Sequence, residues 1–228
     1  MNTHSFTYSP PEGTGYRVSL LVDDKNTWIF PWAKMLLDLL SPHHEVSLHQ
    51  DFRQIAPGDV CFFLGYLTRV PPDILKRNRH NLVIHESDLP QGRGWSPVAW
   101  QVSSGVNDIP VCVFEATDEL DAGPVYLRDT IALDGTELLP EIREKQGRKT
   151  VELCLRVLEQ WEKLEAEIQD GPPSYYRRRT AEDDRLDIKK SIEANFNHLR
   201  ILDNENYPGW FDYKNCRYII KIYKENNA

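Results

Sequence analysis

The feature that most constrains this chain is an alternation of short apolar runs with amphipathic segments between residues 16 and 132. Continuous apolar runs are typical of strands that are covered on both faces. Helical patterns separate them, over about residues 28–40, 71–78 and 96–103. This alternation predicts an α/β fold with a mainly parallel sheet. The predicted strands are YRVSLLVDD, HEVSLHQ, DVCFFLGY, NLVIH, IPVCVFEA and VYLRDTIAL.

The rest of the chain divides into a long helix and a C-terminal extension. An apolar stripe with spacings of three and four predicts that the helix packs on the core, and the sequence QDGPPSYY ends it near residue 170. We therefore predict a flexible N-terminal lead-in over residues 1–16, a main domain over 17–169 and an extension over 170–228. The extension is expected to hold a helix near residues 189–202 and a hairpin. The stripe consists of Val151, Leu155, Leu158, Trp161 and Leu164.

Charge and motif content exclude several functional classes. The formal net charge is −8, which disfavours sequence-independent binding of nucleic acid. No apolar run approaches the roughly 18 residues of a membrane helix, and the N-terminus lacks a signal-peptide layout, so we expect a cytoplasmic protein. No dinucleotide fingerprint or phosphate-binding loop follows the first strand. The four scattered cysteines are expected to be reduced and buried, and no metal site is expected.

Polar residues gather at two places that could carry chemistry. The strand NLVIH ends in His85, which Glu86, Ser87 and Asp88 follow directly. Sites in parallel α/β sheets are built at the carboxyl ends of the strands. The second place is the segment EATDELDAGPVYLRD, residues 115–129, which contains Asp121 before Ala-Gly-Pro and is expected on the same side of the sheet as His85.

In order and spacing, these two segments resemble the N10-formyltetrahydrofolate-dependent formyltransferase family. That family has a histidine at a strand end, then a Ser-x-Leu-Pro turn and an Arg-Gly-x-Ser-Pro helix start. An Asp-x-Gly loop comes some 30 residues later. This chain has His85, SDLP at 87–90, RGWSP at 93–97 and DAG at 121–123. The match extends to about residue 165, and it implies a Rossmann-like formyltransferase fold for the main domain.

The resemblance implies that His85, Asp121 and Ser87 form the catalytic group. An amine attacks the formyl carbon of the folate, so a tetrahedral oxyanion forms and the ammonium must lose a proton. His85 suits this proton transfer because its reference pKa lies near neutrality, and Asp121 would orient the imidazole or a water. The family has asparagine two residues before the histidine, whereas this chain has Val83. Asn81 lies about 6.6 Å further back than Val83 on the same strand face and is not expected to reach the oxyanion. Either Ser87 or a backbone N–H supplies the missing donor, or the activity is impaired or altered.

The resemblance also assigns the two substrates. The donor is N10-formyltetrahydrofolate, with Gly65, Leu67, Asp118, Glu119 and Leu120 expected to bind it. The extension resembles that of sugar-nucleotide N-formyltransferases of the pseudaminic-acid type, which implies a UDP-linked 4-amino-4,6-dideoxy sugar as the acceptor. The expected partners are this nucleotide sugar and the folate, with no nucleic acid and no membrane, and a homodimer is compatible with them. The residues expected to bind the acceptor are Arg93, Gly94, Trp95, Tyr176, Arg177, Arg178 and Arg179.

Each assignment has a structural alternative. His85 could be an ordinary hydrogen-bonded histidine at a strand end, and Asp121 an ordinary turn carboxylate. The arginines 177–179 could pair with Glu182, Asp183 and Asp184 on a solvated face, and Trp95 could pack on the core. The alternative functions are formylation of glycinamide ribonucleotide or methionyl-tRNA, and non-catalytic binding of folate or nucleotide.

Overall fold

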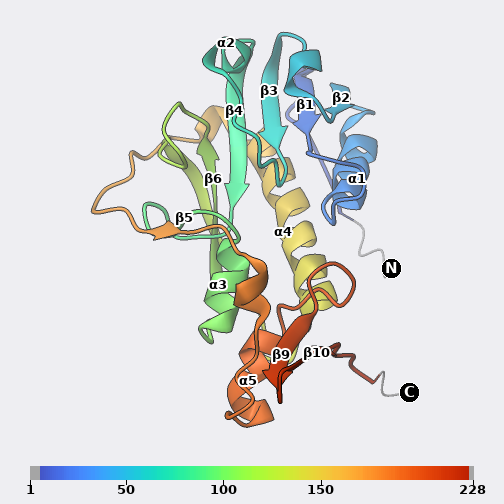
Figure 1. Cartoon of the computed structure of the whole chain (residues 1–228). Helices are drawn as coiled ribbons and strands as arrows, with labels where there is room; N and C mark the ends of the chain where they lie inside the picture. The colour runs from blue at the N-terminus through green and yellow to red at the C-terminus, as the bar shows by residue number, and fades with distance from the viewer. Residues whose placement is uncertain (1–5, 226–228) are drawn as a thin grey trace.

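The computed structural model describes residues 6–225 and is built around one six-stranded sheet, shown in Figure 1. The strand order is β2-β1-β3-β4-β6-β7. Strands β1 to β4 pair in parallel, whereas β6 runs antiparallel to β4 and β7 antiparallel to β6. The predicted α/β fold with a mainly parallel sheet is confirmed. The strands are β1 (Arg17–Leu21), β2 (Glu45–His49), β3 (Gly58–Phe63), β4 (Asn78–His85), β6 (Asp108–Glu115) and β7 (Val125–Ala132).

One face of the sheet is covered by α1 (Phe30–Leu40) and α4 (Leu139–Gln160), which contact each other. Alternate strand residues such as Val18, Phe62 and Leu82 face these helices in the main core. Val151, Leu155 and Leu158 of the predicted stripe pack into the same core from α4, and Trp161 and Leu164 contact it from just beyond the helix. Prolines near the amino ends of both helices suit the first turn, where a missing N–H leaves no hydrogen bond unmade.

The opposite face carries shorter elements and the loops of the candidate site. Leu21, Phe63 and Val83 point to this side and pack with η1 (Phe52–Gln54) and α2 (Pro72–Leu75). The carboxyl ends of β3 and β4 point toward α3 (Pro97–Ser103) and the C-terminal extension (Figure 1). The parallel part of the sheet therefore presents its strand ends beside the extension.

The long helix ends earlier than the sequence indicates. After α4, one turn of 3-10 helix, η2 (Trp161–Lys163), leads into an extended segment. Val125 and Glu167 there exchange two backbone hydrogen bonds of 2.8 Å. Pairing with the start of β7 thus overrides the helical propensity of residues 164–169.

The C-terminal extension contains short elements around a small apolar cluster of its own. The predicted helix is shorter than expected, and Ser191 caps it by accepting a hydrogen bond from the Ala194 N–H. Leu186, Leu199 and Leu202 form the cluster. The predicted hairpin is present as β9 and β10. The elements are β8 (Tyr175–Tyr176), η3 (Ala181–Asp184), α5 (Ile192–Leu199), β9 (Gly209–Tyr213) and β10 (Cys216–Ile220).

The predicted N-terminal lead-in falls partly outside the described residues. Its first five residues lie there, and residues 6–15 form no helix or strand. Phe6 and Tyr8 nevertheless pack against the main core, and the Tyr8 hydroxyl hydrogen-bonds the His44 ring. The division into lead-in, main domain and extension stays a proposal.

Three of the four cysteines are buried, as expected, but Cys216 is exposed on the hairpin. The expectation of burial was wrong for Cys216, because β10 turns most of its side chains to solvent. Within residues 6–225, none of the helices has the length and apolarity needed to cross a membrane.

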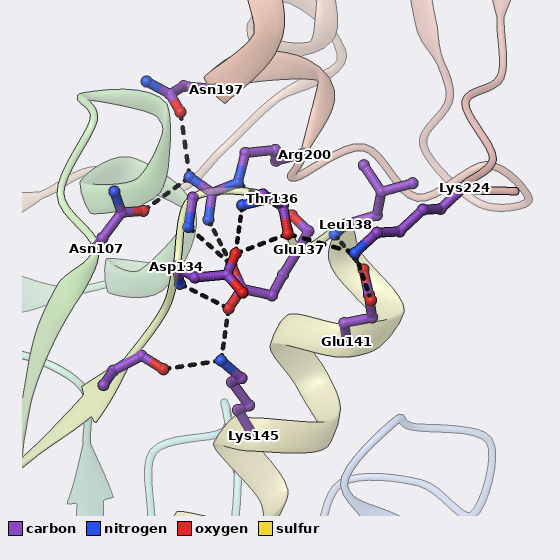
Figure 2. Close-up of polar contacts among 12 residues, drawn as sticks. Asn107, Asp134, Thr136, Glu137, Leu138, Glu141, Lys145, Asn197, Arg200 and Lys224 are labelled. Atoms are coloured by element: carbon purple, nitrogen blue, oxygen red, sulfur yellow. Dashed lines mark hydrogen bonds and ion pairs between the residues drawn. The ribbon is translucent and has the colours of Figure 1, made fainter. Parts of the chain in front are cut away.

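A buried ion pair fastens the extension to the start of α4 (Figure 2). Arg200, at the end of α5, is fully buried and donates from Nη2 to Glu137 Oε2 at 3.1 Å and from Nε to the Glu137 carbonyl at 3.0 Å. Its third nitrogen donates to the side chains of Asn107 and Asn197. Burial raises the pKa of Glu137, but hydrogen bonds from Lys145 and the backbone outweigh this and hold the pKa below its ordinary value. The pair therefore stays ionised, and all three guanidinium nitrogens of Arg200 donate hydrogen bonds.

We expect Arg200→Ala to lower the free energy of unfolding by about 3–5 kcal/mol, because the buried Glu137 carboxylate loses its partner. Urea denaturation monitored by tryptophan fluorescence would measure this loss. Arg17→Ala is the matched control, since it removes an exposed pair with Glu45 and should cost no more than about 1 kcal/mol. Equal losses in the two variants would contradict an anchoring role for Arg200.

Candidate active site

His85 lies at the carboxyl end of β4, where its side chain is almost fully buried. Its Nε2 atom is 2.8 Å from the carbonyl oxygen of Gly92. A carbonyl only accepts, so Nε2 must carry a proton, and Nδ1 holds the lone pair whenever the ring is neutral. The edge of the ring rests against Phe114, with centroids 6.2 Å apart. His85 is thus a rigidly held imidazole with a defined tautomer.

Asp121 approaches this imidazole from a loop that folds back over the sheet. Because β6 runs antiparallel, its last residue, Glu115, pairs with Leu82 and not with His85. Loop 116–124 therefore returns toward the end of β4 instead of starting there, which corrects the expectation that this loop simply follows a strand on the side of His85. Asp121 Oδ2 ends 3.9 Å from His85 Nε2. This distance suits a charge interaction and exceeds that of a direct hydrogen bond.

The backbone N–H of Gly94 is the direct partner of the Asp121 carboxylate, at 2.7 Å. Gly94 has a φ of +104° and lies in β5 (Arg93–Gly94), which pairs in parallel with β8. A Cβ atom at this position would lie 2.3 Å from the Tyr176 carbonyl oxygen. Only glycine fits both constraints. The Arg93-Gly94 turn therefore binds the Asp121 carboxylate through a backbone N–H.

Ser87 is buried two residues after His85, and its hydroxyl has no hydrogen-bond partner among residues 6–225. A Cβ atom at Gly92 would lie 3.0 Å from Ser87 Cβ, so this hydroxyl is next to the turn that holds His85. Native proteins seldom leave a buried hydroxyl unpaired without a reason. Ser87 is thus a polar group that no described residue hydrogen-bonds, next to the turn that holds His85.

The two other positions considered for an oxyanion donor do not supply one. Val83 is apolar and packs beside Phe63 and Phe114 on the neighbouring strands. The Asn81 amide donates to the Leu75 carbonyl at 2.8 Å, at the far end of the strand. Asn81 therefore does not reach the site, as its distance along the strand predicts.

Glu86 lies immediately after His85, and no role for it was predicted from the sequence. Its carboxylate accepts a hydrogen bond of 2.6 Å from Gln146 on α4. Burial raises the pKa of Glu86, against smaller opposing effects of that hydrogen bond and of the His85 charge. The sequence feature that could have identified Glu86 is its position, since it is an acidic residue directly after the strand-end histidine.

The two loops expected to bind the folate lie in contact. Arg69 donates to the Asp118 carbonyl at 3.1 Å, which joins the loop after β3 to the loop after β6. Leu67 and Leu120 are 60% and 44% exposed, so both offer apolar surface to a ligand. Gly65, with a φ of +58°, makes the turn after β3. All five predicted donor residues thus belong to one joined pair of loops.

Glu119, also expected to bind the donor, accepts a hydrogen bond from Arg93, which was expected to bind the acceptor. Arg93 is buried, and its guanidinium donates to Glu119 at 2.9 Å and to Gln169 at 2.8 Å. These contacts leave Arg93 little capacity to bind a ligand directly. We interpret it as a support for the loops.

Trp95 and Tyr176 line the outer side of the same turn. Trp95 is 36% exposed, so it is only partly committed to packing. A Cβ atom at Gly92 would lie 2.7 Å from the Tyr176 ring, which therefore closes over the turn beside His85. Burial raises the pKa of the Tyr176 hydroxyl. Both aromatic residues remain where an acceptor near His85 could contact them.

The three consecutive arginines of the extension differ in their partners. Arg177 pairs with Asp183, and Arg179 pairs with Asp184 at 2.6 Å. Both guanidinium groups also stack on Trp100 of α3, 4.7 and 5.4 Å from the ring centroid. Arg178 is exposed and has no ion pair within the described part of the chain. The structural alternative, pairing with nearby acids, thus applies to Arg177 and Arg179. Arg178 is the arginine of the three that remains available to a ligand.

Asp23, directly after β1, is a further acidic group at this edge and was given no role from sequence. Its carboxylate accepts the Leu67 N–H at 2.9 Å. Burial raises the pKa of Asp23, while this hydrogen bond and the charge of Arg178 act in the opposite direction. Asp23 therefore connects the donor loop electrostatically to Arg178.

A surface hollow of about 750 Å³ lies at the other edge of the sheet. It is lined by residues at the amino ends of β1 and β3, including Arg17, His44 and Asp59. None of the predicted site residues borders it, so we assign it no part in the chemistry.

Comparison with known proteins identifies the family. The formyl transferase family model matches residues 40–158, just over half of the chain. A methionyl-tRNA formyltransferase from Thermus thermophilus is 31% identical over 181 residues, which cover 76% of this chain. The chain belongs to the formyl transferase family. Enzymes of this family use N10-formyltetrahydrofolate.

Solved structures of two formyltransferases and of HypX share the fold. A methionyl-tRNA formyltransferase from Clostridium thermocellum superposes with a TM-score of 0.77 at 16% identity, covering 93% of this chain and 95% of its own. A sugar N-formyltransferase from Shewanella gives 0.70 at 11% identity, covering 93% and 99%. HypX from Aquifex aeolicus, in complex with tetrahydrofolic acid, gives 0.74 at 20% identity, covering 92% and 38%.

The matched region is only part of the sequence relative. This chain spans 57% of the length of the Thermus methionyl-tRNA formyltransferase. Family membership therefore establishes the type of domain, while the acceptor has to be argued from this chain's own residues.

Proposed function

We propose that this protein transfers a formyl group from N10-formyltetrahydrofolate to the amine of a nucleotide-linked amino sugar. The observation that carries the transfer is the placement of His85, Asp121 and Ser87 around one turn, with Asp121 Oδ2 3.9 Å from His85 Nε2. An imidazole, a carboxylate and an uncommitted hydroxyl are the groups that acyl transfer to an amine needs.

The reaction forms one bond and breaks another. The acceptor nitrogen attacks the formyl carbon, and a C–N bond forms as the carbonyl oxygen becomes negatively charged. Collapse of this intermediate breaks the bond to N10, and the proton lost by the amine ends on N10 of tetrahydrofolate. The contact of Nε2 with the Gly92 carbonyl leaves the Nδ1 lone pair to take that proton and pass it on, while the Asp121 carboxylate lies 3.9 Å from Nε2.

Ser87 is our proposed oxyanion donor in place of the family asparagine. Its buried hydroxyl can donate one hydrogen bond, and no acceptor in residues 6–225 uses it. A donor that is held in a dry site and aimed at developing charge can stabilise a transition state strongly. Val83 then needs no polar replacement on its own strand.

The charge distribution favours a small anionic acceptor over a large one. The chain carries −8 overall, and acids neutralise two of the three arginines in the extension. Binding of tRNA relies on many phosphate contacts by Lys and Arg. A pyrophosphate needs one well-placed guanidinium, which Arg178 offers, and Tyr176 or Trp95 could pack on the sugar or base.

Methionyl-tRNA is the second candidate acceptor. The observation that favours it is the 31% identity to the Thermus methionyl-tRNA formyltransferase. The two candidates share the chemistry at His85 and differ only in what the extension must bind.

The direct test is a panel of acceptors incubated with N10-formyltetrahydrofolate, with tetrahydrofolate release measured for each. We expect turnover with UDP- or dTDP-linked amino sugars, and little with glycinamide ribonucleotide or methionyl-tRNA. His85→Ala should lower kcat/KM by about 10²-fold or more, the scale of losing an acid–base group. Turnover of methionyl-tRNA alone would replace the sugar assignment, and no turnover with any amine would refute formyl transfer.

Ser87→Ala should change activity and stability in different directions. We expect kcat to fall by about 10²-fold or more, as for loss of an oxyanion donor. The melting temperature should stay level or rise, because the substitution removes a buried unpaired hydroxyl. Ser104→Ala, at an exposed serine just after α3, is the control and should leave kcat unchanged. Unchanged kcat in Ser87→Ala would remove Ser87 from the mechanism.

Arg178→Ala should raise KM for the nucleotide sugar by about tenfold with little change in kcat, since a charge-assisted hydrogen bond to phosphate contributes about 1.5–3 kcal/mol. Arg177→Ala is the matched control, because that guanidinium is already paired with Asp183. Steady-state kinetics at two salt concentrations would compare them. A larger KM effect from Arg177→Ala would contradict the choice of Arg178.

A further inference from the structure

We propose that Gln169 is a positioning residue that holds Asp121 in place against His85, an inference that rests on the proposed formyl transfer. The Gln169 amide nitrogen donates to the carbonyl oxygens of Asp121 and Gly123, both at 2.8 Å. Gln169 lies beyond residues 40–158, which match the family model, yet it grips the backbone of the predicted catalytic loop.

Asp121 needs such support because its backbone is strained. Its φ is +49°, in the left-handed region that non-glycine residues seldom adopt. Conformations of this kind persist only where the surroundings fix them. Gln169 fixes the main chain of Asp121, and the Gly94 N–H fixes its carboxylate. Nearby, Gly123 is pressed so close to β6 that a Cβ would lie 1.7 Å from the Glu115 carbonyl oxygen.

Arg93 in turn fixes Gln169. Its Nε and Nη2 atoms both donate to Gln169 Oε1, at 3.2 and 2.8 Å. This bidentate contact orients the amide so that its NH₂ group faces the two carbonyls. Arg93 is itself buried, so the chain of contacts from Arg93 through Gln169 to Asp121 is shielded from solvent at its base.

Gln169 belongs to a segment, residues 167–176, that touches both catalytic loops, and we call it the strap. At one end Glu167 pairs with Val125, just after the Asp121 loop. At the other end Ser174 Oγ accepts the Gly92 N–H at 2.9 Å, beside the carbonyl that holds His85. The strap thus joins the His85 turn to the Asp121 loop, and Gln169 is its contact with Asp121.

Two substitutions separate the contacts of Gln169. Gln169→Leu removes both the acceptor for Arg93 and the N–H donors to the loop. Gln169→Glu keeps an acceptor for Arg93 and loses only the two N–H donors. We expect each to lower kcat by about 10- to 100-fold, the scale for small misplacement of a catalytic group, with acceptor KM changed less than threefold. Gln160→Leu, at an exposed glutamine on the last turn of α4, is the control. Wild-type kcat in Gln169→Glu would overturn the proposal.

A double-mutant cycle tests whether the effect passes through Asp121. In an Asp121→Ala background, Gln169→Leu should lower kcat less than twofold further, because the group that it positions is gone. A purely structural role would give the same fold-loss in both backgrounds and would refute positioning.

Hydrogen exchange gives a readout that does not depend on formyl transfer. The Gly94 amide donates to Asp121, so both Gln169 variants should exchange it at least tenfold faster, with no such change in Gln160→Leu. Unchanged exchange at Gly94 would overturn the positioning of Asp121 even in an active enzyme. An inactive wild type with faster exchange in the variants would refute the proposed function and leave the positioning intact.

Discussion

The hydrogen bond from the Gly94 N–H to the Asp121 carboxylate is the contact on which the candidate site depends. It joins two loops that leave the sheet from strands of opposite direction, β4 and β6. Together with the hydrogen bonds from Gln169 to the loop backbone, it holds the Asp121 loop at the end of β4 although β6 runs antiparallel. The 3.9 Å separation of Asp121 and His85 follows from this contact together with the bond between His85 and Gly92. The two backbone groups that make these contacts, the Gly94 N–H and the Gly92 carbonyl, belong to one turn, residues 92–94.

The extension reinforces that turn and is itself anchored elsewhere. Its first part pairs β8 with β5 beside His85, and its later part is fastened to the start of α4 by the buried pair of Arg200 and Glu137. A buried pair of this kind favours one docking geometry, because any other leaves an unpaired charge in a dry interior. The arginines 177–179 lie between these two attachments. Their positions near the site are therefore set by the body of the protein and not by local preference.

Much of the framework was predictable because it follows from local pattern. Apolar runs identified the six strands, and the stripe on α4 identified its buried side, since burial leaves a direct imprint on residue type. The catalytic candidates were found through residue order, with His85 at a strand end and Asp121 before Gly123. No role was predicted from the sequence for Glu86 or Gln169, nor was the returning path of loop 116–124. A single glutamine or glutamate gives no periodic signal, and strand direction is decided by long-range pairing.

The sequence by itself determined which segments become strands and helices, where polar groups end the strands, and the overall charge of −8. Only the tertiary structure decided which of these groups meet. It paired Arg177 and Arg179 with acids and left Arg178 available, and it committed Arg93 to Glu119 and Gln169. It also left the buried Ser87 hydroxyl without a hydrogen-bond partner among residues 6–225. The physical reason is that hydrogen bonding and charge pairing are short-ranged and directional. Their outcome depends on separations of a few ångströms, which are fixed by packing between segments far apart along the chain.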